Sequence, residues 1–466
     1  MMFVFALFSS FLLAAILVLL DFFPARSLFA ENILMYFIYQ QGNILSFDIE
    51  KKVFMTIIAA SLAVFVIFYI VLPLFFKPPT RALAKKAVAF LLFFFAVLKV
   101  ETTVRLTRAV MGSLTPGRLF ETSFKEPSYV PPERKKNLIF IFMESIENAY
   151  RSETVSGRNL IPYLSADGGT VFSDYLEIRG ADTTSSSMIA ALCGLPNIPS
   201  LETLVRNRHD FMFSGNACVT DILDKEGYAT FFYTSGDAKY ANKDAFMTAH
   251  HVRRIKDGPA MRTGHGDEGV TFFDGVKDSV MFKNAVEDIK KAGRENPPFA
   301  FFILTLDTHE PDGFLDPECA RSPDGKRDAA AEFKDVVSCS DAQIRKFVAA
   351  LENEPFFKDT LIVLAGDHLA RTNGLSPMLE TLRHRTVYNK FINMTPPPAD
   401  PNRTFTSLDL APTVLEALGF RLKDGAFGLG RSLLRPAPTL IEEHGKEGLE
   451  RELLKKSKKY NGFLKK

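Results

Sequence analysis

The sequence lacks a strong excess of charge of either sign. Its 466 residues include 56 Lys and Arg against 54 Asp and Glu, which gives a formal net charge of +2. Nucleic-acid-binding domains carry a clear basic excess, so we expect no nucleic-acid partner. Tryptophan is absent too, and we find no internal repeat. A chain of this length is typical of two to four domains.

Charged residues are missing from two long apolar runs near the N-terminus. Residues 2–20 and 53–76 carry none, and each run is long enough to cross about 30 Å of hydrocarbon as a helix. A shorter run, 87–100, contains Lys99, whose amine can reach the interface. The first run has no basic residues before it and no small-x-small cleavage site after it, so we expect a retained anchor rather than a signal peptide. The sequence therefore predicts a membrane domain, residues 1–100, with three transmembrane helices.

The distribution of basic residues predicts the orientation of these helices. The short loop after the second run holds Lys77, Arg81, Lys85 and Lys86 and no acidic residue, whereas residues 24–52 carry charges of both signs. The positive-inside rule places residues 77–86 in the cytoplasm. Three spans then place everything after residue 100 outside. If the third run is only a surface helix, the rest of the chain is cytoplasmic instead.

Cysteine is absent from the predicted membrane domain. All four cysteines, Cys193, Cys218, Cys319 and Cys339, come later in the chain. An even number in an exported domain favours disulfides. The pairing 193–218 with 319–339 is one of three connectivities, and four buried free thiols remain an alternative.

Three further regions follow the membrane domain. Residues 101–136 mix basic and apolar residues and then become proline-rich, which predicts a juxtamembrane helix and linker; an ordinary solvated connector fits as well. Residues 137–435 form the predicted folded domain. Residues 436–466 are a charged tail, which we expect to be an exposed helix with a frayed end.

The predicted domain alternates short apolar runs with helical patterns. The runs at 137–144, 229–235, 299–309 and 360–368 are continuous and rich in Ile, Val and Phe, as in strands buried on both faces. Helical patterns at 279–293 and 341–353 lie between them. This alternation predicts an α/β domain with a mostly parallel central sheet.

Three of the predicted strands end in side chains that bind metals or transfer protons. These are Glu144, the pair Asp307 and His309, and the pair Asp367 and His368. Sites in open α/β sheets form outside the carboxyl ends of the strands. Two carboxylates and an imidazole, from Glu144, Asp367 and His368, suit Mn²⁺ or Zn²⁺, with Mg²⁺ as an alternative. Helix capping by the acidic residues is the plainer interpretation.

Five hydroxyl side chains, at residues 183–187, precede an apolar helical pattern. The N-terminus of a helix stabilises an alkoxide and binds phosphate oxygens, so one hydroxyl can serve as a nucleophile. Serine and threonine are also favoured as helix caps. The stretch alone does not separate these interpretations.

Taken together, the motifs resemble the lipoteichoic acid synthase and phosphoglycerol transferase family of the alkaline phosphatase and sulfatase superfamily, in particular the transferases that modify periplasmic glucans. The matching stretches are "NLIFIFMESIE", "TTSSSMIAALCGLP", "YTSGDAKYANKDAF", "LTLDTHEPDGF", "VLAGDHLARTN", "DLAPTVLEALG" and "FGLGRSLL", within residues 137–434. The resemblance implies an alkaline-phosphatase-like α/β/α domain in the periplasm or outside, anchored in a bacterial inner membrane.

The resemblance also implies roles for individual residues. The implied metal ligands are Glu144, Thr184, Asp367 and His368, and Thr184 is the implied nucleophile. His309 falls on a histidine that binds the substrate phosphate and can protonate the leaving group. Lys243 falls where lipoteichoic acid synthase has an arginine that holds phosphoglycerol. Mn²⁺ is the favoured metal.

The sequence departs from this family at three points. Lys243 offers a point charge in place of the two-pronged guanidinium. Ala241 stands where lipoteichoic acid synthase has a tryptophan. Three predicted spans stand in place of five, although an odd number keeps the same orientation.

The implied reaction moves phosphoglycerol from phosphatidylglycerol to a glycan or glucan acceptor through a phosphothreonine-type intermediate. A phosphoethanolamine transferase or a headgroup phosphodiesterase of the same superfamily is the alternative. A sulfatase would need a Cys or Ser in a C/S-x-P-x-R setting, which "TTSSS" lacks. A catalytically inactive relative would not need to keep the full set of Glu144, Thr184, Asp367, His368 and His309.

Overall fold

The computed structural model describes residues 115–198, 213–262, 275–295, 298–321 and 328–463. The three predicted membrane spans, at 2–20, 53–76 and 87–100, lie outside these ranges. Within the ranges, no helix has the length and apolarity needed to cross a membrane. The described residues from Pro116 onward belong to one compact unit.

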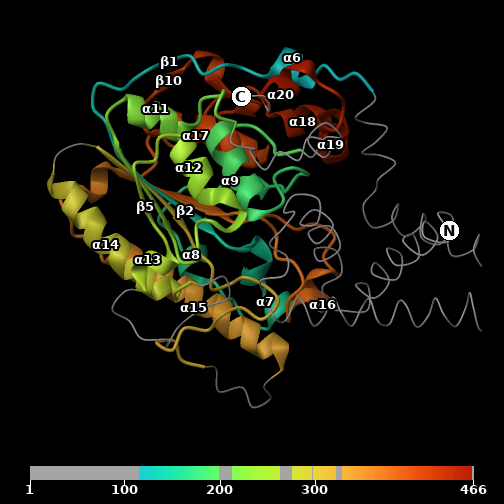
Figure 1. The fold of residues 1–466 in the computed structure, drawn as a ribbon. Helices are drawn as coiled ribbons and strands as arrows, with labels where there is room; N and C mark the ends of the chain where they lie inside the picture. Colours follow the sequence, from blue (N-terminus) through green and yellow to red (C-terminus); the bar gives the residue numbers. More distant parts are fainter. Residues whose placement is uncertain (1–114, 199–212, 263–274, 296–297, 322–327, 464–466) are drawn as a thin grey trace, which may run out of the picture. The chain divides into compact units, whose positions relative to one another are not determined.

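A six-stranded sheet forms the centre of this unit, in the order β5-β4-β6-β2-β7-β8 (Figure 1). The strands are β5 Arg254–Lys256, β4 Ala229–Thr234, β6 Phe299–Leu304, β2 Asn137–Met143, β7 Thr360–Gly366 and β8 Asn389–Ile392. The first five strands are parallel and β8 pairs antiparallel with β7. The predicted mostly parallel sheet is confirmed, and each of the four predicted strands is present.

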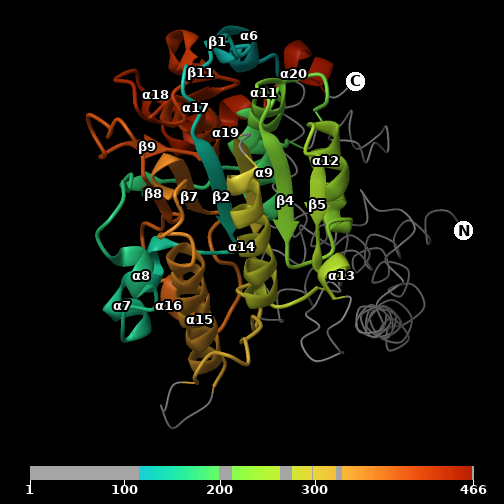
Figure 2. The same ribbon diagram turned by 90° about the vertical axis from the view of Figure 1, so that its left-hand side faces the viewer.

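Helices cover both faces of the sheet. Alternate residues of β2 point to opposite faces, and each set joins a separate apolar core. One face packs against α14 Asp278–Arg294 and α15 Ala329–Ala349, and α14 lies in front of the strands in Figure 2. The other face packs against α9 Thr184–Cys193, α11 Val219–Lys225 and α17 Leu410–Ala417. Both predicted helical patterns fall on the first face: α14 contains the whole of the first, and α15 covers most of the second.

Shorter elements complete the unit. The helices are α6 Leu119–Ser123, α7 Glu153–Ser156, α8 Pro162–Ser165, α12 Lys243–Ala249, α13 Gly258–Met261, α16 Ser376–Leu379, α18 Leu440–His444, α19 Lys446–Leu453 and α20 Lys458–Phe463. The strand pairs are β1 Tyr129–Val130 with β10 Arg421–Leu422, β3 Asp174–Tyr175 with β9 Thr404–Phe405, and β11 Ala426–Phe427 with β12 Gly430–Arg431. The pairing of β1 with β10 ties the predicted linker to the domain.

The charged C-terminal segment is docked as far as Phe463, so the prediction of an exposed helix is wrong, while the predicted frayed end, residues 464–466, lies outside the described residues. Leu449, Leu453 and Tyr460 are buried. Leu449 and Leu453 are four residues apart and share one face of α19, an apolar stripe that the surrounding charges obscure. The hydroxyl of Tyr460 accepts from the backbone N–H of Ile198 at 2.8 Å and donates to the carbonyl of Pro196 at 2.9 Å.

The cysteines form two disulfides, Cys193–Cys218 and Cys319–Cys339. Each bond joins two cysteines that follow one another in the order of the four along the chain. Of the three connectivities, the structure therefore has the pairing 193–218 with 319–339. The alternative of four buried free thiols is wrong.

We predict that Tyr460→Phe lowers the free energy of unfolding by about 1–3 kcal/mol, because the buried N–H of Ile198 loses its acceptor. The measurement is chemical unfolding of the full chain in detergent, followed by circular dichroism. Tyr240→Phe is the matched control, since the Tyr240 side chain is 39% exposed. Equal effects of the two substitutions would show that the C-terminal segment is not held by this contact.

Candidate metal centre and active site

The carboxyl ends of β2 and β7 bring three predicted ligands together. Glu144 follows β2, and Asp367 and His368 follow β7. One ligand atom from each lies within 4.8 Å of the others, and all three residues are buried. The two strands are paired in parallel with Met143 opposite Gly366, so the next residue of each strand enters the same space.

Asp367 presents one oxygen to this space without a hydrogen bond. Its Oδ1 accepts from the backbone N–H groups of Ser145 and His368, each at 2.8 Å. Its Oδ2 is buried, makes no hydrogen bond, and lies 3.4 Å from Nε2 of His368. A buried carboxylate oxygen left without a hydrogen bond is costly, and a metal ion would satisfy it.

The ring of His368 is held with Nε2 toward the same space. Its Nδ1 donates to the backbone carbonyl of Leu369 at 3.0 Å, which leaves the Nε2 lone pair for a ligand. Nε2 lies 3.5 Å from Oε1 of Glu144. Metal-binding histidines are typically fixed in this way through their second nitrogen. The donor set and the open Asp367 oxygen therefore fit a divalent cation.

Thr184 is the first residue of α9 and faces this cluster. Its Oγ1 lies 3.3 Å from Oε2 of Glu144 and 3.4 Å from Nε2 of His368. Thr183 is the helix cap instead: it forms a reciprocal capping box with Ser186. The cap and the hydroxyl that points at the cluster are thus different residues, and Thr184 Oγ1 lies at the positive end of the helix.

Burial and mutual charge shift the pKa values of the ligands. Burial raises the pKa of Glu144 to about 7, helped by the charge of Asp367. Burial works to lower the pKa of His368, but Asp367 and Glu144 outweigh it and raise that pKa to about 9. Without a metal, the cluster therefore retains protons at neutral pH. A cation would replace them.

His309 and Lys243 interact electrostatically with Glu144: His309 influences the pKa of Glu144, and Glu144 influences the pKa of Lys243. The charge of His309 works to lower the pKa of Glu144, and Nδ1 of His309 bonds the carbonyl of Glu310 at 2.8 Å. Lys243 begins α12 and is buried. Burial lowers its pKa to about 8, and Glu144 is the main opposing charge. Its Nζ donates to the carbonyl of Tyr240 at 2.6 Å.

Ser145 and Glu310 belong to the site but were missed from the sequence. The Ser145 hydroxyl lies 2.9 Å from Oε1 of Glu144 and 3.1 Å from Oε2 of Glu310. Ser145 has a φ of 55°, a left-handed conformation that is uncommon outside glycine. In the sequence, only the position of Ser145 directly after Glu144 pointed to a role in the site. That position does not reveal the left-handed backbone conformation.

Asp307 lies beyond the end of β6, which stops at Leu304, and does not join the cluster. Its Oδ2 accepts from the backbone N–H of Asp278 at 3.1 Å. Burial, together with the charge of Asp278, holds the pKa of Asp307 well above its usual range. Asp307 therefore belongs to a buried carboxyl pair at the start of α14.

Comparisons with known proteins agree with this fold and these motifs. The sulfatase family model matches residues 136–420. Phosphoglycerol transferase I of Salmonella paratyphi B is 31% identical over 322 residues, which cover 68% of this chain and 41% of that protein. The same protein of Salmonella typhimurium gives the same values. The chain thus spans less than half the length of these curated relatives.

Two solved structures show the same fold. A protein of the alkaline phosphatase superfamily from Vibrio parahaemolyticus has a TM-score of 0.55 and 20% identity, with 72% of this chain and 79% of that chain covered. The lipoteichoic acid synthase LtaP from Listeria monocytogenes has a TM-score of 0.52 and 19% identity, with 64% and 75% covered. The sulfatase family model matches more than half of the residues of this chain, which therefore belongs to the sulfatase family of the alkaline phosphatase superfamily.

Proposed function

We propose that the protein is a membrane-anchored, metal-dependent transferase that moves phosphoglycerol from phosphatidylglycerol to a glycan or glucan acceptor. The observation that carries this proposal is the position of Thr184 Oγ1, at a helix N-terminus and 3.3 Å from Oε2 of Glu144. The similarity to phosphoglycerol transferase I supports the choice of transferred group. A soluble hydrolase would have no need of the predicted anchor.

Glu144, Asp367 and His368 would hold one divalent cation, with Thr184 Oγ1 as a fourth ligand. Mn²⁺ is our choice for this mixed set of carboxylate and imidazole, and Mg²⁺ or Zn²⁺ would also fit. When bound, the cation lowers the pKa of the Thr184 hydroxyl and balances charge on the phosphoryl oxygens.

The reaction has two displacements. In the first, Thr184 Oγ1 loses its proton to water and forms a bond to the phosphorus, while the bond from phosphorus to the diacylglycerol oxygen breaks. His309 donates a proton to that leaving oxygen. In the second, an acceptor hydroxyl gives its proton to His309 and its oxygen attacks the phosphorus. The bond from phosphorus to Thr184 Oγ1 breaks, and the released alkoxide takes a proton from water.

Lys243 would bind the phosphate of the transferred group. Its ammonium is buried near Glu144, and burial destabilises the charged form. A negatively charged phosphate oxygen beside the ammonium would offset that cost. Ala241, at the position of the synthase tryptophan, leaves the glycerol with less aromatic contact. The headgroup is therefore recognised mainly through its charge.

The proposed location is the bacterial inner membrane, with the catalytic domain in the periplasm. Two disulfides in the described residues support an oxidising compartment. An anchor that holds the site near its lipid donor raises the effective concentration of that donor.

The direct test incubates the full chain in vesicles with headgroup-labelled phosphatidylglycerol or phosphatidylethanolamine, with and without added glucan. We expect label from phosphatidylglycerol on Thr184 and then on glucan. Label taken only from phosphatidylethanolamine would make the protein a phosphoethanolamine transferase. Free phosphoglycerol formed at the same rate without glucan would make it a phosphodiesterase.

We predict that Thr184→Val lowers turnover at least about 10³-fold, because the nucleophilic oxygen is removed while the shape is kept. Thr184→Ser, which retains the hydroxyl, keeps measurable activity and still accepts the label. Both variants should bind metal. Undiminished turnover in Thr184→Val would overturn the nucleophile assignment.

We predict that the affinity for Mn²⁺ rises as the pH is raised from about 6 to about 9. Glu144 and His368, with pKa values of about 7 and about 9, must lose their protons when they bind the cation, so protons compete with it at lower pH. Calorimetry in buffers of different ionisation enthalpy counts the protons released.

Asp367→Asn should weaken this affinity by more than about 100-fold, since loss of an outer-shell partner alone costs 10–100-fold. Glu443→Gln, at an exposed position of α18, is the control and should change nothing. A pH-independent affinity, or equal affinities of the two variants, would show that the metal binds elsewhere.

We predict that Lys243→Met raises the KM for the lipid donor about 10- to 100-fold, the loss expected for a charge-assisted hydrogen bond of about 1.5–3 kcal/mol. Lys243→Arg keeps the charge and should retain most of the affinity. The wild-type KM should rise above about pH 8, where Lys243 loses its proton, and the KM of the Arg variant should not. Identical pH profiles would exclude contact between residue 243 and the phosphate.

A further inference from the structure

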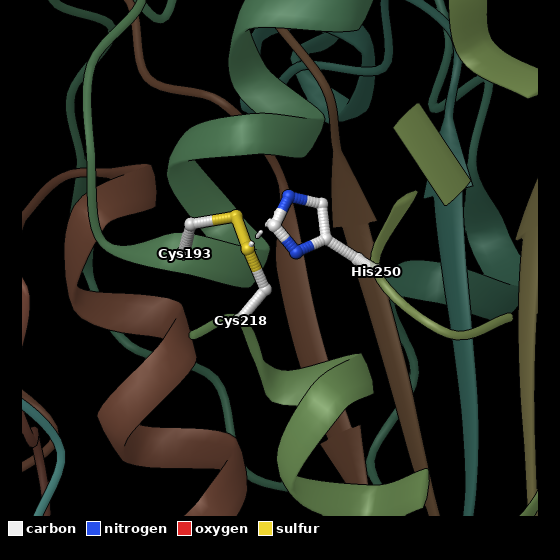
Figure 3. Close-up of side chains that lie close together, drawn as sticks. All are labelled: Cys193, Cys218 and His250. Carbon is white, nitrogen blue, oxygen red and sulfur yellow. Dashed lines mark hydrogen bonds between the residues drawn. A yellow bond between two sulfur atoms is a disulfide. The ribbon is translucent and has the colours of Figure 1, made fainter. Parts of the chain in front are cut away.

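A second group of ligand-type side chains lies where α9 ends, α11 begins and α12 ends. Cys193 is the last residue of α9, Cys218 caps the start of α11, and His250 follows the end of α12. The two cysteines form a disulfide, and Nε2 of His250 lies 3.6 Å from Sγ of Cys218. Figure 3 shows the imidazole ring directed at the S–S bond.

These three residues are shielded from solvent. Cys193, Cys218 and His250 are 1%, 0% and 1% exposed, and their ligand atoms all lie within 4.8 Å of one another. Among the described residues, the other disulfide, Cys319–Cys339, belongs to no such group. The histidine therefore distinguishes the first disulfide from an ordinary structural one.

Asp221 fixes the orientation of the His250 ring. Its Oδ2 lies 2.7 Å from Nδ1 of His250 and accepts from the backbone N–H of Cys218 at 2.6 Å. With Nδ1 bound to the carboxylate, Nε2 is presented to the sulfur. Carboxylate, imidazole and metal form this same chain in many metal sites, where the carboxylate sets the tautomer and raises the basicity of the ligand.

We propose that Cys193, Cys218 and His250 form a second metal site in the reduced chain, for Zn²⁺ or another borderline-soft divalent cation, with Asp221 as the residue that positions His250. Two thiolates and one imidazole are a ligand set that Zn²⁺ favours, with a water in the fourth position. Carboxylate-rich sites suit harder cations, so this site selects differently from the one at Glu144. The proposal does not depend on the proposed function.

The disulfide and the metal exclude each other. A dithiol reductant supplies two electrons and two protons, so the S–S bond breaks, two thiols form and the reductant becomes a disulfide. The cation then displaces the two thiol protons as it binds. In the reverse direction, a disulfide oxidant accepts two electrons from the two thiolates, the S–S bond re-forms and the cation is released.

The site would therefore keep the same elements together in both redox states. The disulfide links the end of α9 to the start of α11, and His250 brings in the end of α12. A cation bound by the same three residues maintains this link before oxidation. The other ends of α9 and α12 carry Thr184 and Lys243.

Cobalt is a suitable probe, because thiolate ligation gives an intense charge-transfer absorption that carboxylate and imidazole ligation do not. The full-length Cys319→Ser/Cys339→Ser variant, in detergent and free of oxygen, is titrated with Co²⁺ before and after reduction by a phosphine. We expect the thiolate absorption only after reduction, with the final intensity of one thiolate-bound cobalt per chain, because cobalt bound at Glu144, Asp367 and His368 does not give this absorption. We expect its loss when a disulfide oxidant is added.

Matched variants separate the site from chance thiol binding. The Cys193→Ser/Cys218→Ser variant should show no thiolate absorption after reduction. His250→Gln and Asp221→Asn, made in the first variant, should each weaken cobalt binding at least about tenfold, as loss of an orienting partner does in other metal sites. If reduction unfolds the chain, cobalt should restore its circular dichroism.

Three results would overturn the proposal. The first is a reduced Cys319→Ser/Cys339→Ser chain that shows no thiolate absorption. The second is an absorption whose affinity is unchanged by His250→Gln. The third is a reduced, unfolded chain that cobalt neither binds nor refolds.

Discussion

The parallel pairing of β2 with β7 is the constraint on which the site depends. Met143 lies opposite Gly366, so Glu144 and Asp367 leave the sheet side by side. Gly366 has no alternative here: a Cβ at this position would lie 2.1 Å from the carbonyl oxygen of Ile146. A shift of one residue in the register would separate the two carboxylates and turn their side chains to opposite faces. The two apolar cores, one on each face of the sheet, hold the register in place.

This register places like charges together inside the protein. Two carboxylates about 4 Å apart repel each other by about 4 kcal/mol at an effective dielectric constant of about 20, and burial adds to the cost of both. The raised pKa values of Glu144 and His368 show how the chain offsets this cost when only protons are available. Proton retention and affinity for a cation are two responses to the same concentration of negative charge.

The sequence predicted the parts of the fold that follow from periodicity and the parts of the site that follow strand ends. The runs leading to Glu144 and Asp367 are strongly apolar, so their strands and their endings could be located. Thr184 could be singled out among five hydroxyls only through the family resemblance. The structure adds a local reason, because Thr183 is already the cap.

Other features depended on contacts that no local pattern encodes. Ser145 joins the site through a left-handed backbone conformation. Asp307 instead accepts a hydrogen bond from the backbone N–H of Asp278 and lies outside the cluster. From the sequence, the C-terminal helices were expected to be solvated because charged residues of both signs surround the apolar stripe of α19. The predicted membrane domain lies outside the described residues and stays a prediction.

The docking of α20 onto α6 has a consequence for the order of folding during synthesis. The rings of Phe120 and Tyr460 lie 4.7 Å apart, and Glu121 accepts from Ser457 although 336 positions separate them. Neither contact can form until nearly the whole domain has left the ribosome. Contacts of such long sequence separation form slowly, so this part of the core stays open during translation, and an exported chain would close it only on the far side of the membrane.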